Sequence, residues 1–272
     1  MKQKLDSDNR EKILLAEDNE VNQDLAAEML RLMGYDVDIA GDGEQALQAL
    51  DRGNYRLVLM DYKMPVMNGC VATQAWRERE RETQRQAIPI IALTAGEDAL
   101  CLDVGMNDIL HKPFDYENLS RIVHKWIDAK AGEVENYAEN KEVALARPEV
   151  DSKSERYVLD QAQLDLLRNW RGKPNPELTE RVMRLCLVQI SQLCSEMFQA
   201  AEQGDATTVA GIAHILKSSS GTVGAMRLMN LCQKIETRCE TTGTIEMELI
   251  ERARQACADA ELALKRELER LV

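Results

Sequence analysis

The hydrophobic pattern of the first 128 residues alternates between short apolar runs and longer stretches with helical periodicity. Apolar runs begin at residues 12, 57, 88 and 108. Continuous runs of this kind are typical of strands buried on both faces of a parallel sheet. Between the first two runs lies a helical pattern over residues 21–33, which stops at Gly34, a residue type that commonly ends helices. Alternating strands and helices predict an α/β domain with a doubly wound parallel sheet.

The pattern changes after residue 158, where apolar residues recur at helical spacing and no strand-like run is found. The predicted helices cover residues 160–171, 176–203, 206–220, 225–240 and 244–271. Four long helices after a short first one predict an all-α domain, a four-helix bundle.

Residues 129–157 separate the two patterns and are rich in Glu, Lys, Asn and Ser, with Arg147-Pro148 interrupting any continuous helix. We therefore expect one domain at residues 1–128, a linker at 129–157 and a second domain at 158–272. If flexible, a linker of this length spans about 30 Å, so the two domains could meet at an effective concentration of roughly millimolar. The linker equally allows each domain to reach a separate partner.

Composition agrees with two globular domains, because 272 residues with 44% hydrophobic content suffice for a core in each. The net charge of −13 argues against nucleic-acid binding, and no basic stripe is found. The apolar runs are far shorter than the about 20 residues of a membrane helix, and the N-terminus lacks an apolar signal core, so we expect a cytoplasmic protein without membrane insertion. The seven cysteines show no metal-ligand clustering and are expected to be mostly reduced core residues.

Carboxylates stand at the ends of two apolar runs. Glu17 and Asp18 follow the first run, and Asp61 ends the second. Because parallel strands bring their carboxyl ends to one edge of a sheet, these three acids are expected to converge. An acidic pair is most often solvated charge, but the end of a buried strand is an unusual place for that. Three oxygen ligands with room for water suit Mg²⁺, which also accepts a phosphate oxygen.

Two later runs end in groups that bind phosphoryl oxygens. The run from residue 88 places the hydroxyl of Thr94 at its end, and the run from residue 108 is followed by the ammonium of Lys112. In-line phosphoryl transfer depends on positioned charge and hydrogen bonds more than on covalent chemistry by the protein. We expect Lys112 to balance charge and Thr94 to hold one oxygen.

With these motifs, residues 12–128 resemble a response-regulator receiver domain of two-component signalling. In the family's order and spacing, the motifs are Glu17-Asp18, then Met60-Asp61 through Pro65 to Gly69, then Leu93-Thr94-Ala95, then His111-Lys112-Pro113-Phe114. The resemblance implies a flavodoxin-like sheet of five parallel strands with five helices. It also implies that Asp61 accepts a phosphoryl group from a histidine kinase. The Mg²⁺ site it implies consists of Glu17, Asp18, Asp61 and the backbone carbonyl of Lys63.

Two positions bear on how such a receiver behaves. Ile109 stands three residues before Lys112, where the family usually carries a switching aromatic residue, and this argues against an aromatic switch. Lys63 stands two residues after Asp61, where family members vary the lifetime of the phosphoaspartate by controlling the approach of water. We hypothesise that the long side chain of Lys63 slows hydrolysis.

A second candidate site lies on the predicted helix 206–220, which follows an N-cap acid, Asp205. Residues three and four apart share a helix face, so Lys217 and Ser218 are expected beside His214. We expect an exposed imidazole, with the Lys217 cation stabilising a phosphoryl group on a ring nitrogen. A lone helical histidine usually carries no chemistry, but the adjacent lysine and the receiver-like half favour a functional role for His214.

Residues 158–272 resemble a histidine phosphotransfer (HPt) domain through the run Ala213-His214-Ile215-Leu216-Lys217-Ser218-Ser219 and the later Gly224-Ala225. The resemblance implies that His214 exchanges a phosphoryl group with the aspartate of a receiver. Ser218 replaces the family's usual glycine. Its hydroxymethyl group either crowds a docking receiver or donates a hydrogen bond to the phosphoryl group, and we expect it to be tolerated because serine is small.

The two halves together predict a phosphorelay protein, arranged as in the C-terminal part of hybrid sensor histidine kinases, with a histidine kinase and a downstream response-regulator receiver as partners. We do not expect this chain to be an enzyme. The receiver domain is expected to catalyse only its own phosphorylation and dephosphorylation, and no ATP-binding kinase domain is expected. One alternative is a fragment of an ATP-dependent histidine kinase, against which stand the lack of a glycine-rich nucleotide box and the apolar Ile215 after His214. Another is a non-catalytic docking module, against which stands the complete set of receiver motifs.

Overall fold

The computed structural model describes residues 10–94, 98–128, 158–170 and 173–271. The predicted linker, residues 129–157, lies outside this described part. The chain divides into two compact units, residues 1–145 and 146–272. Each unit has buried hydrophobic residues of its own.

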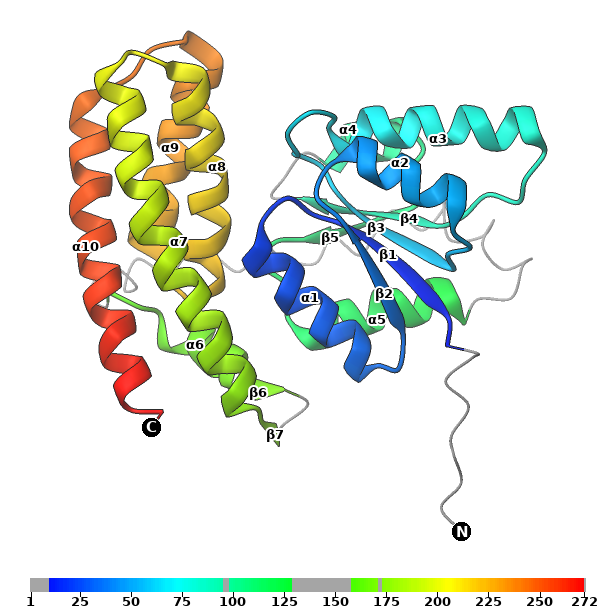
Figure 1. Ribbon diagram of the computed structural model, residues 1–272, viewed down its shortest axis with the longest axis horizontal. Coiled ribbons are helices and arrows are strands. Elements are labelled where there is room, and N and C mark those ends of the chain that lie inside the picture. Colours follow the sequence, from blue (N-terminus) through cyan, green and yellow to red (C-terminus); the bar gives the residue numbers. More distant parts are fainter. Residues whose placement is uncertain (1–9, 95–97, 129–157, 171–172, 272) are drawn as a thin grey trace. The chain divides into compact units, whose positions relative to one another are not determined.

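The first unit is built on a parallel sheet of five strands in the order β2-β1-β3-β4-β5 (Figure 1). The strands are β1 (Lys12–Ala16), β2 (Asp36–Ala40), β3 (Leu57–Asp61), β4 (Ile90–Thr94) and β5 (Asp108–His111). Strands β3 and β4 are buried along their whole length, as expected for strands covered on both faces. The predicted flavodoxin-like, doubly wound fold is confirmed.

Helices cover both faces of this sheet (Figure 1). One face carries α1 (Glu20–Leu32) and α5 (Tyr116–Ile127), and the other carries α2 (Gly43–Arg52), α3 (Gly69–Thr83) and α4 (Asp98–Asp103). Four of these helices start at a polar N-cap whose side chain accepts a hydrogen bond from the first turn: Asn19, Asp42, Asn68 and Asp115. Such caps fix where a helix begins. The loops at the carboxyl ends of the strands are therefore held at both ends.

Two strand limits differ from the sequence pattern. The apolar run begins at Ile88, but β4 begins at Ile90, because Pro89 has no N–H to donate to the ladder. The carbonyl of Pro89 still accepts a hydrogen bond of 2.9 Å from the N–H of Val58. Strand β5 ends at His111, one residue before Lys112.

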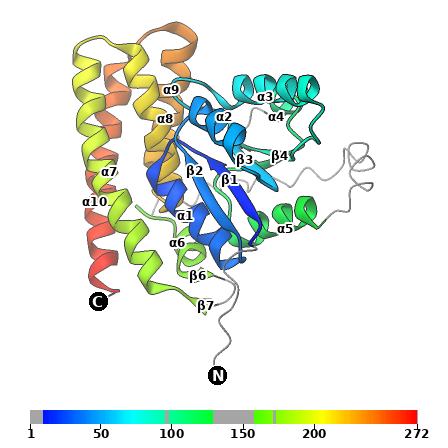
Figure 2. The same ribbon diagram turned by 45° about the vertical axis from the view of Figure 1, so that its right-hand side comes forward.

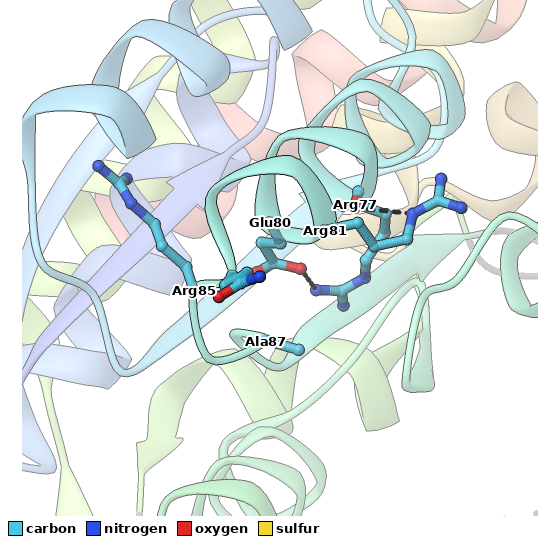
Figure 3. A pocket seen from close by; sticks show the side chains of 6 residues that line it. Arg77, Glu80, Arg81, Arg85 and Ala87 are labelled. Carbon is cyan, nitrogen blue, oxygen red and sulfur yellow. Dashed lines mark hydrogen bonds and ion pairs between the residues drawn. The ribbon is translucent and has the colours of Figure 1, made fainter.

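Arg77 of α3 joins that helix to the two segments that lead into β4 and β5. Its guanidinium donates to the carbonyls of Ile88 and Gly105, each at 2.9 Å, and to the carboxylate of Glu80 at 2.7 Å. Figure 3 shows this group in a pocket that Arg81, Gln84, Arg85 and Ala87 also line. The pocket lies at the C-terminal end of α3, about 20 Å along the helix from the carboxyl ends of the strands. Arg77 therefore holds elements of the fold together at a distance from Glu17, Asp18 and Asp61.

The second unit is a bundle of four helices, α7 (Pro176–Glu202), α8 (Ala206–Thr222), α9 (Met226–Thr242) and α10 (Met247–Glu269), which lie side by side in both views (Figures 1 and 2). The short α6 (Gln161–Arg168) precedes them. The N–H of Asp160 donates to the carbonyl of Gly224 at 2.8 Å, which fastens the start of α6 to the turn between α8 and α9. Gly224 has a φ of +74°, and a Cβ there would lie 2.9 Å from the Asp160 carbonyl oxygen, so this position requires glycine. The predicted helical bundle is confirmed.

One prediction for this unit was wrong. The sequence suggested a helix over residues 160–171 and no strands, whereas α6 ends at Arg168 and β6 (Asn169–Trp170) pairs antiparallel with β7 (Lys173–Pro174). The side chain of Asn175 caps α7, which has Pro176 at its start. The chain has to reverse before this cap, and two short paired segments make that reversal.

Helix α7 has 27 residues and is long enough to reach across a lipid bilayer. Charged residues recur along it, among them Glu180, Arg181 and Arg184. Within the described ranges, no helix combines the length and the apolar character of a membrane span.

Candidate functional site

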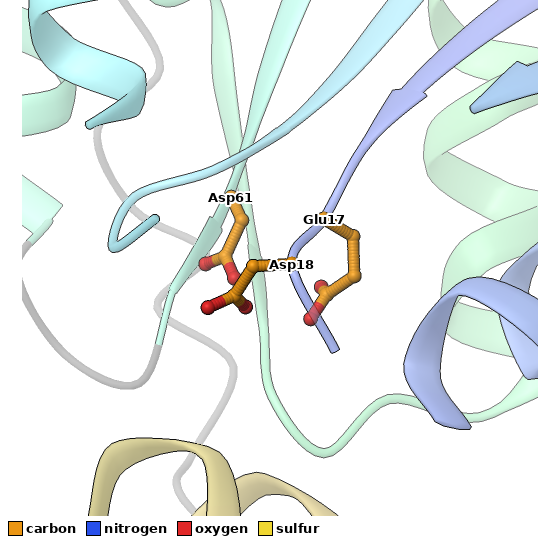
Figure 4. A group of neighbouring side chains, drawn as sticks. All are labelled: Glu17, Asp18 and Asp61. Atoms are coloured by element: carbon orange, nitrogen blue, oxygen red, sulfur yellow. The ribbon is translucent and has the colours of Figure 1, made fainter. Parts of the chain in front are cut away.

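Three acidic side chains meet at the carboxyl end of the sheet. Strands β1 and β3 are neighbours, with Ala16 opposite Met60, so the residues that follow them emerge side by side. Glu17, Asp18 and Asp61 each offer a carboxylate oxygen, and these oxygens lie within 4.8 Å of one another (Figure 4). Glu17 is 1% exposed and Asp61 is 3% exposed. The structure therefore brings together the three acids that the sequence placed at strand ends.

The ammonium of Lys112 bridges two of these acids. Its Nζ lies 2.7 Å from Oδ2 of Asp61 and 2.6 Å from Oε2 of Glu17. The backbone N–H of Lys112 donates to the carbonyl of Thr94 at 2.8 Å, which continues the pairing of β4 and β5 and sets the start of the lysine side chain. Lys112 thus reaches across β4 to the ends of β1 and β3.

Glu17 has a second partner that the sequence did not suggest. Nδ2 of Asn22, on α1, donates to Oε1 of Glu17 at 2.8 Å. Asn22 is buried, and it lies on a helix face that otherwise carries apolar residues such as Leu25 and Ala26. A polar residue at an apolar position of a helix is the signal by which Asn22 could have been found.

The charge in this cluster is unbalanced toward the acids. Burial raises the pKa of Asp61, the charges of Glu17 and Asp18 raise it further, and the ammonium of Lys112 lowers it without reversing the shift. Burial lowers the pKa of Lys112, but Asp61 and Glu17 outweigh burial and hold it above its usual value. Lys112 is therefore a fixed cation, and the site favours additional positive charge.

The donor atoms fit Mg²⁺. Carboxylate oxygens are its preferred protein ligands. The excess of negative charge in this site offsets the free energy needed to remove water from the ion. Asp18 is half-buried, so the cluster stays accessible from solvent on that side. Lys63 lies half-buried in the loop after Asp61, and its carbonyl remains a predicted further ligand.

Thr94 is the last residue of β4, and it is buried. The preceding residue, Leu93, lies opposite Asp61 in the sheet. The Thr94 side chain therefore stands at the same edge of the sheet as the three acids, on the strand next to Asp61.

The second candidate site joins helices α8 and α9. Nδ1 of His214 lies 2.7 Å from Oε1 of Glu236, and Nζ of Lys217 lies 2.6 Å from the other oxygen, Oε2. Glu236 is 1% exposed. One buried carboxylate on α9 therefore holds both the histidine and the lysine of α8.

Glu236 decides which nitrogen of the His214 ring carries a proton. Burial raises the pKa of Glu236, but the hydrogen bond with His214 and the charge of Lys217 outweigh burial and hold it well below its usual range. Glu236 is thus ionised and can only accept, so Nδ1 of His214 must carry a proton. In the neutral imidazole, Nε2 then holds the lone pair.

Two expectations for this site need correction. The imidazole was expected to be exposed, but the His214 side chain is only 19% exposed, because its Nδ1 edge faces Glu236 inside the bundle. Lys217 was expected beside an exposed histidine, yet its own side chain is buried, and its ammonium forms an ion pair with Glu236. Ser218 is half-buried, and its carbonyl accepts a hydrogen bond of 3.2 Å from the hydroxyl of Thr222.

Glu236 was not among the predicted site residues. It lies on the face of α9 that packs into the bundle, among the buried residues Leu228, Leu231, Cys232, Ile235 and Cys239. A glutamate at the apolar spacing of an amphipathic helix needs a partner, because burying an unpaired charge is costly. That signal was present in the sequence, although it does not say which residue is the partner.

Comparison with known families matches both units. Residues 13–124 match the model of the response regulator receiver domain, and residues 181–272 match the model of the Hpt domain.

Curated relatives include hybrid signal transduction histidine kinase B of Dictyostelium discoideum, which is 42% identical over 119 residues, and the sensor histidine kinase GacS of Pseudomonas protegens, which is 30% identical over 230 residues. The first match covers 39% of this chain and 6% of the relative. The second covers 83% of this chain and 24% of the relative, so the chain corresponds to a minor part of these longer proteins.

Among solved structures, the chain is similar to the receiver domain of sensor histidine kinase PA1611 from Pseudomonas aeruginosa PAO1. That match has 43% identity and a TM-score of 0.41, and it covers 44% of this chain and 100% of the other. The relative holds a magnesium ion in its active site cleft.

The chain therefore contains a response regulator receiver domain followed by an Hpt domain, which are phosphotransfer modules of two-component phosphorelays.

Proposed function

We propose that Asp61 accepts a phosphoryl group from the phosphohistidine of a histidine kinase, and that His214 exchanges a phosphoryl group with the aspartate of a receiver. The observation that carries this proposal is the contact of Lys112 with both Asp61 and Glu17, at 2.7 and 2.6 Å. It gives a buried carboxylate a cation that can turn toward incoming phosphoryl oxygens. Asp18 adds a third acid beside them.

In the step at Asp61, a carboxylate oxygen forms a bond to phosphorus while the P–N bond of the phosphohistidine breaks. The electron pair of that bond stays on the imidazole nitrogen, so no proton has to move when the imidazole leaves in its neutral form. Lys112 balances the charge of the phosphoryl oxygens, and the hydroxyl of Thr94 donates to one of them. Mg²⁺, held by Glu17, Asp18, Asp61 and the carbonyl of Lys63, would supply further positive charge to these oxygens.

In the step at His214, Nε2 is the nitrogen that gains or loses the phosphoryl group. Nδ1 is not available, because it keeps its proton and donates a hydrogen bond to Glu236. Glu236 acts as a positioning residue that fixes the tautomer and the orientation of the ring. It also holds Lys217 one turn along α8 from the histidine. The ammonium offsets the negative charge that a phosphoryl group brings to the site.

The partners that follow from this chemistry are a histidine kinase as donor and a response-regulator receiver as the next acceptor. Under this proposal the chain catalyses only the phosphorylation and dephosphorylation of its own receiver, and it neither binds nor uses ATP. A chain supplied by ATP-dependent kinases works where ATP is, which we take to be the cytoplasm. The acidic net charge of −13 argues against a nucleic-acid partner.

Small phosphodonors test the two acceptors separately on the full chain. Acetyl phosphate with Mg²⁺ should label Asp61 with base-labile acyl phosphate, and phosphoramidate should label His214 with acid-labile phosphohistidine. Asp61→Asn should lose the first label and His214→Gln the second.

The matched controls are Asp36→Asn, at the far end of the sheet, and His124→Gln, an exposed histidine of α5. Both should keep both labels. Labels that survive Asp61→Asn and His214→Gln, or label obtained from ATP alone, would refute the proposal.

A further inference from the structure

Val66, in the loop between β3 and α3, is the most exposed large hydrophobic side chain among the described residues, at 81%. Its backbone has a φ of +64°, in the left-handed region. A β-branched residue is strained there, because its Cβ crowds the neighbouring carbonyl, and glycine or asparagine would be more stable. Val66 thus combines an unfavourable backbone conformation with an apolar side chain that is unfavourably exposed to water.

The strain belongs to a tight three-residue turn. The N–H of Met67 donates to the carbonyl of Pro65 at 2.6 Å, so Val66 is the central residue of a γ-turn with positive φ, the rarer and more strained form. Met64 is buried and Met67 packs against the core of the sheet. Two flanking side chains therefore point into the protein, and the turn projects Val66 outward.

The loop is held at both ends by close backbone contacts. The N–H of Gly69 donates to the carbonyl of Tyr62 at 3.0 Å, and a Cβ on Gly69 would lie 2.1 Å from the carbonyl oxygen of Asp61. The N–H of Gly43, the first residue of α2, donates to the carbonyl of Met67 at 2.9 Å. A Cβ on Gly43 would lie 2.6 Å from that oxygen, so both glycines are required for these approaches.

The strained turn therefore lies between two segments that close backbone contacts hold in place. Strain of this kind persists where the surroundings over-determine the backbone, and it gathers at functional sites. The loop leaves the sheet directly after Asp61 and returns to touch the Asp61 carbonyl through Gly69. Val66 is therefore an exposed apolar group in the loop that directly follows Asp61.

We propose that Val66 is the apolar contact that docks the helix carrying the donor phosphohistidine onto the receiver unit. The inference rests on the proposed function. A donor imidazole has to reach Asp61 in line, within a few ångströms, and the helix that bears it is about 10 Å wide. Such a helix also covers the loop that follows Asp61 and approaches it again at Gly69. A small acyl phosphate needs no such contact, so Val66 selects protein donors without taking part in the chemistry.

The test compares a protein donor with a small donor on the same acceptor. The protein donor is the full chain with Asp61→Asn, loaded on His214 with phosphoramidate. The acceptor is the full chain with His214→Gln, with or without Val66→Asn. Asparagine tolerates positive φ, so this variant should be at least as thermally stable as its parent.

We expect Val66→Asn to lower the second-order rate constant for transfer from the protein donor about tenfold, as loss of one apolar contact predicts. Labelling by acetyl phosphate should stay within about twofold of the parent. Val66→Ile, which keeps the apolar group, should transfer at the parental rate. The matched control is Leu32→Asn, an exposed leucine at the far end of α1, and it should change neither rate.

Equal transfer rates for Val66→Asn and its parent, with acetyl phosphate labelling intact, would overturn the docking role and leave the proposed function standing. A parallel loss of both rates would also overturn it, because Val66 would then act on the shape of the site. An acceptor that acetyl phosphate cannot label at Asp61 would instead refute the proposed function, and the docking role with it.

Discussion

Nδ1 of His214 donates a hydrogen bond of 2.7 Å to Glu236, a carboxylate almost wholly removed from solvent. The other oxygen of that carboxylate holds the ammonium of Lys217. One acid therefore sets the tautomer of the imidazole and stabilises the neighbouring cation. A residue on a different helix therefore leaves Nε2 as the ring nitrogen that we propose to carry the phosphoryl group.

Replacing Glu236 should slow phosphorylation of His214. Glu236→Ala removes the acceptor of the Nδ1 proton and leaves Lys217 buried without its carboxylate, so we predict a loss of about 100-fold in the rate of labelling by phosphoramidate. Glu236→Gln keeps a carbonyl acceptor but loses the charge, and about a tenfold loss is expected. The control is Glu240→Ala, an exposed acid one turn along α9. Wild-type rates in both Glu236 variants would show that the carboxylate has only a packing role.

The same residue predicts a pH dependence of stability. The folded-state pKa of Glu236 lies well below its usual value of 4.5, so the ionised form binds its partners more strongly in the folded state. The stability it contributes is present above about pH 4.5 and is lost as pH falls toward the folded-state pKa. Urea unfolding of wild type and Glu236→Gln from about pH 6 to about pH 2 should give a difference in free energy that shrinks with acid. A difference that grows with acid would contradict this assignment.

Mg²⁺ should stabilise the receiver unit. An ion bound only by the folded acid cluster adds about 2.7 kcal/mol to the free energy of unfolding at 100 times its dissociation constant. Thermal melts with Mg²⁺ and with a chelator should show this increase in wild type. Asp18→Asn should lose most of it, because one of three carboxylates is removed, whereas Asp36→Asn at the other end of the sheet should keep it. An equal response of both variants would place the ion elsewhere.

Lys63 should prolong the life of phosphorylated Asp61. Its long side chain stands two residues after the acceptor, in a loop held by close contacts at both ends, where it can hinder the approach of water. We predict that Lys63→Ala shortens the half-life of the acyl phosphate several-fold, on the order of 1 kcal/mol in barrier. The measurement is the decay of labelled protein after removal of acetyl phosphate, with Lys12→Ala at the amino end of β1 as control. Identical half-lives would remove the hypothesis.

The sequence was sufficient for those parts of the structure that depend on local pattern. The buried strands before Glu17 and Asp61 were visible as continuous apolar runs, and the parallel arrangement followed from the helices between them. Acids at the ends of neighbouring strands then had to converge, because all strands of the sheet end at the same edge.

What the sequence could not supply were the contacts between elements. Glu236 lies 22 residues from His214, and only the packing of α8 against α9 brings it to the imidazole. Asn22 reaches Glu17 in the same way, through the position of α1 against the sheet. The periodicity of a helix indicates that polar residues such as Glu236 and Asn22 face inward. Which residue each of them contacts depends on how the helices and strands pack together. The positive φ of Val66 is a further case, because the loop around it makes close backbone approaches at Gly43 and Gly69 that the sequence alone does not reveal.

The central claim is that Asp61 accepts a phosphoryl group from a phosphohistidine and that His214 exchanges one with a receiver aspartate. The most direct measurement is the transfer of a phosphoryl group between two full-length variants. The Asp61→Asn chain is loaded with labelled phosphoryl on His214 and mixed with the His214→Gln chain in the presence of Mg²⁺. We predict that acid-labile label leaves the first chain as base-labile label appears on Asp61 of the second. Label that stays on His214 until it is lost to water, while Asp61 of the second chain remains open to acetyl phosphate, would contradict the account.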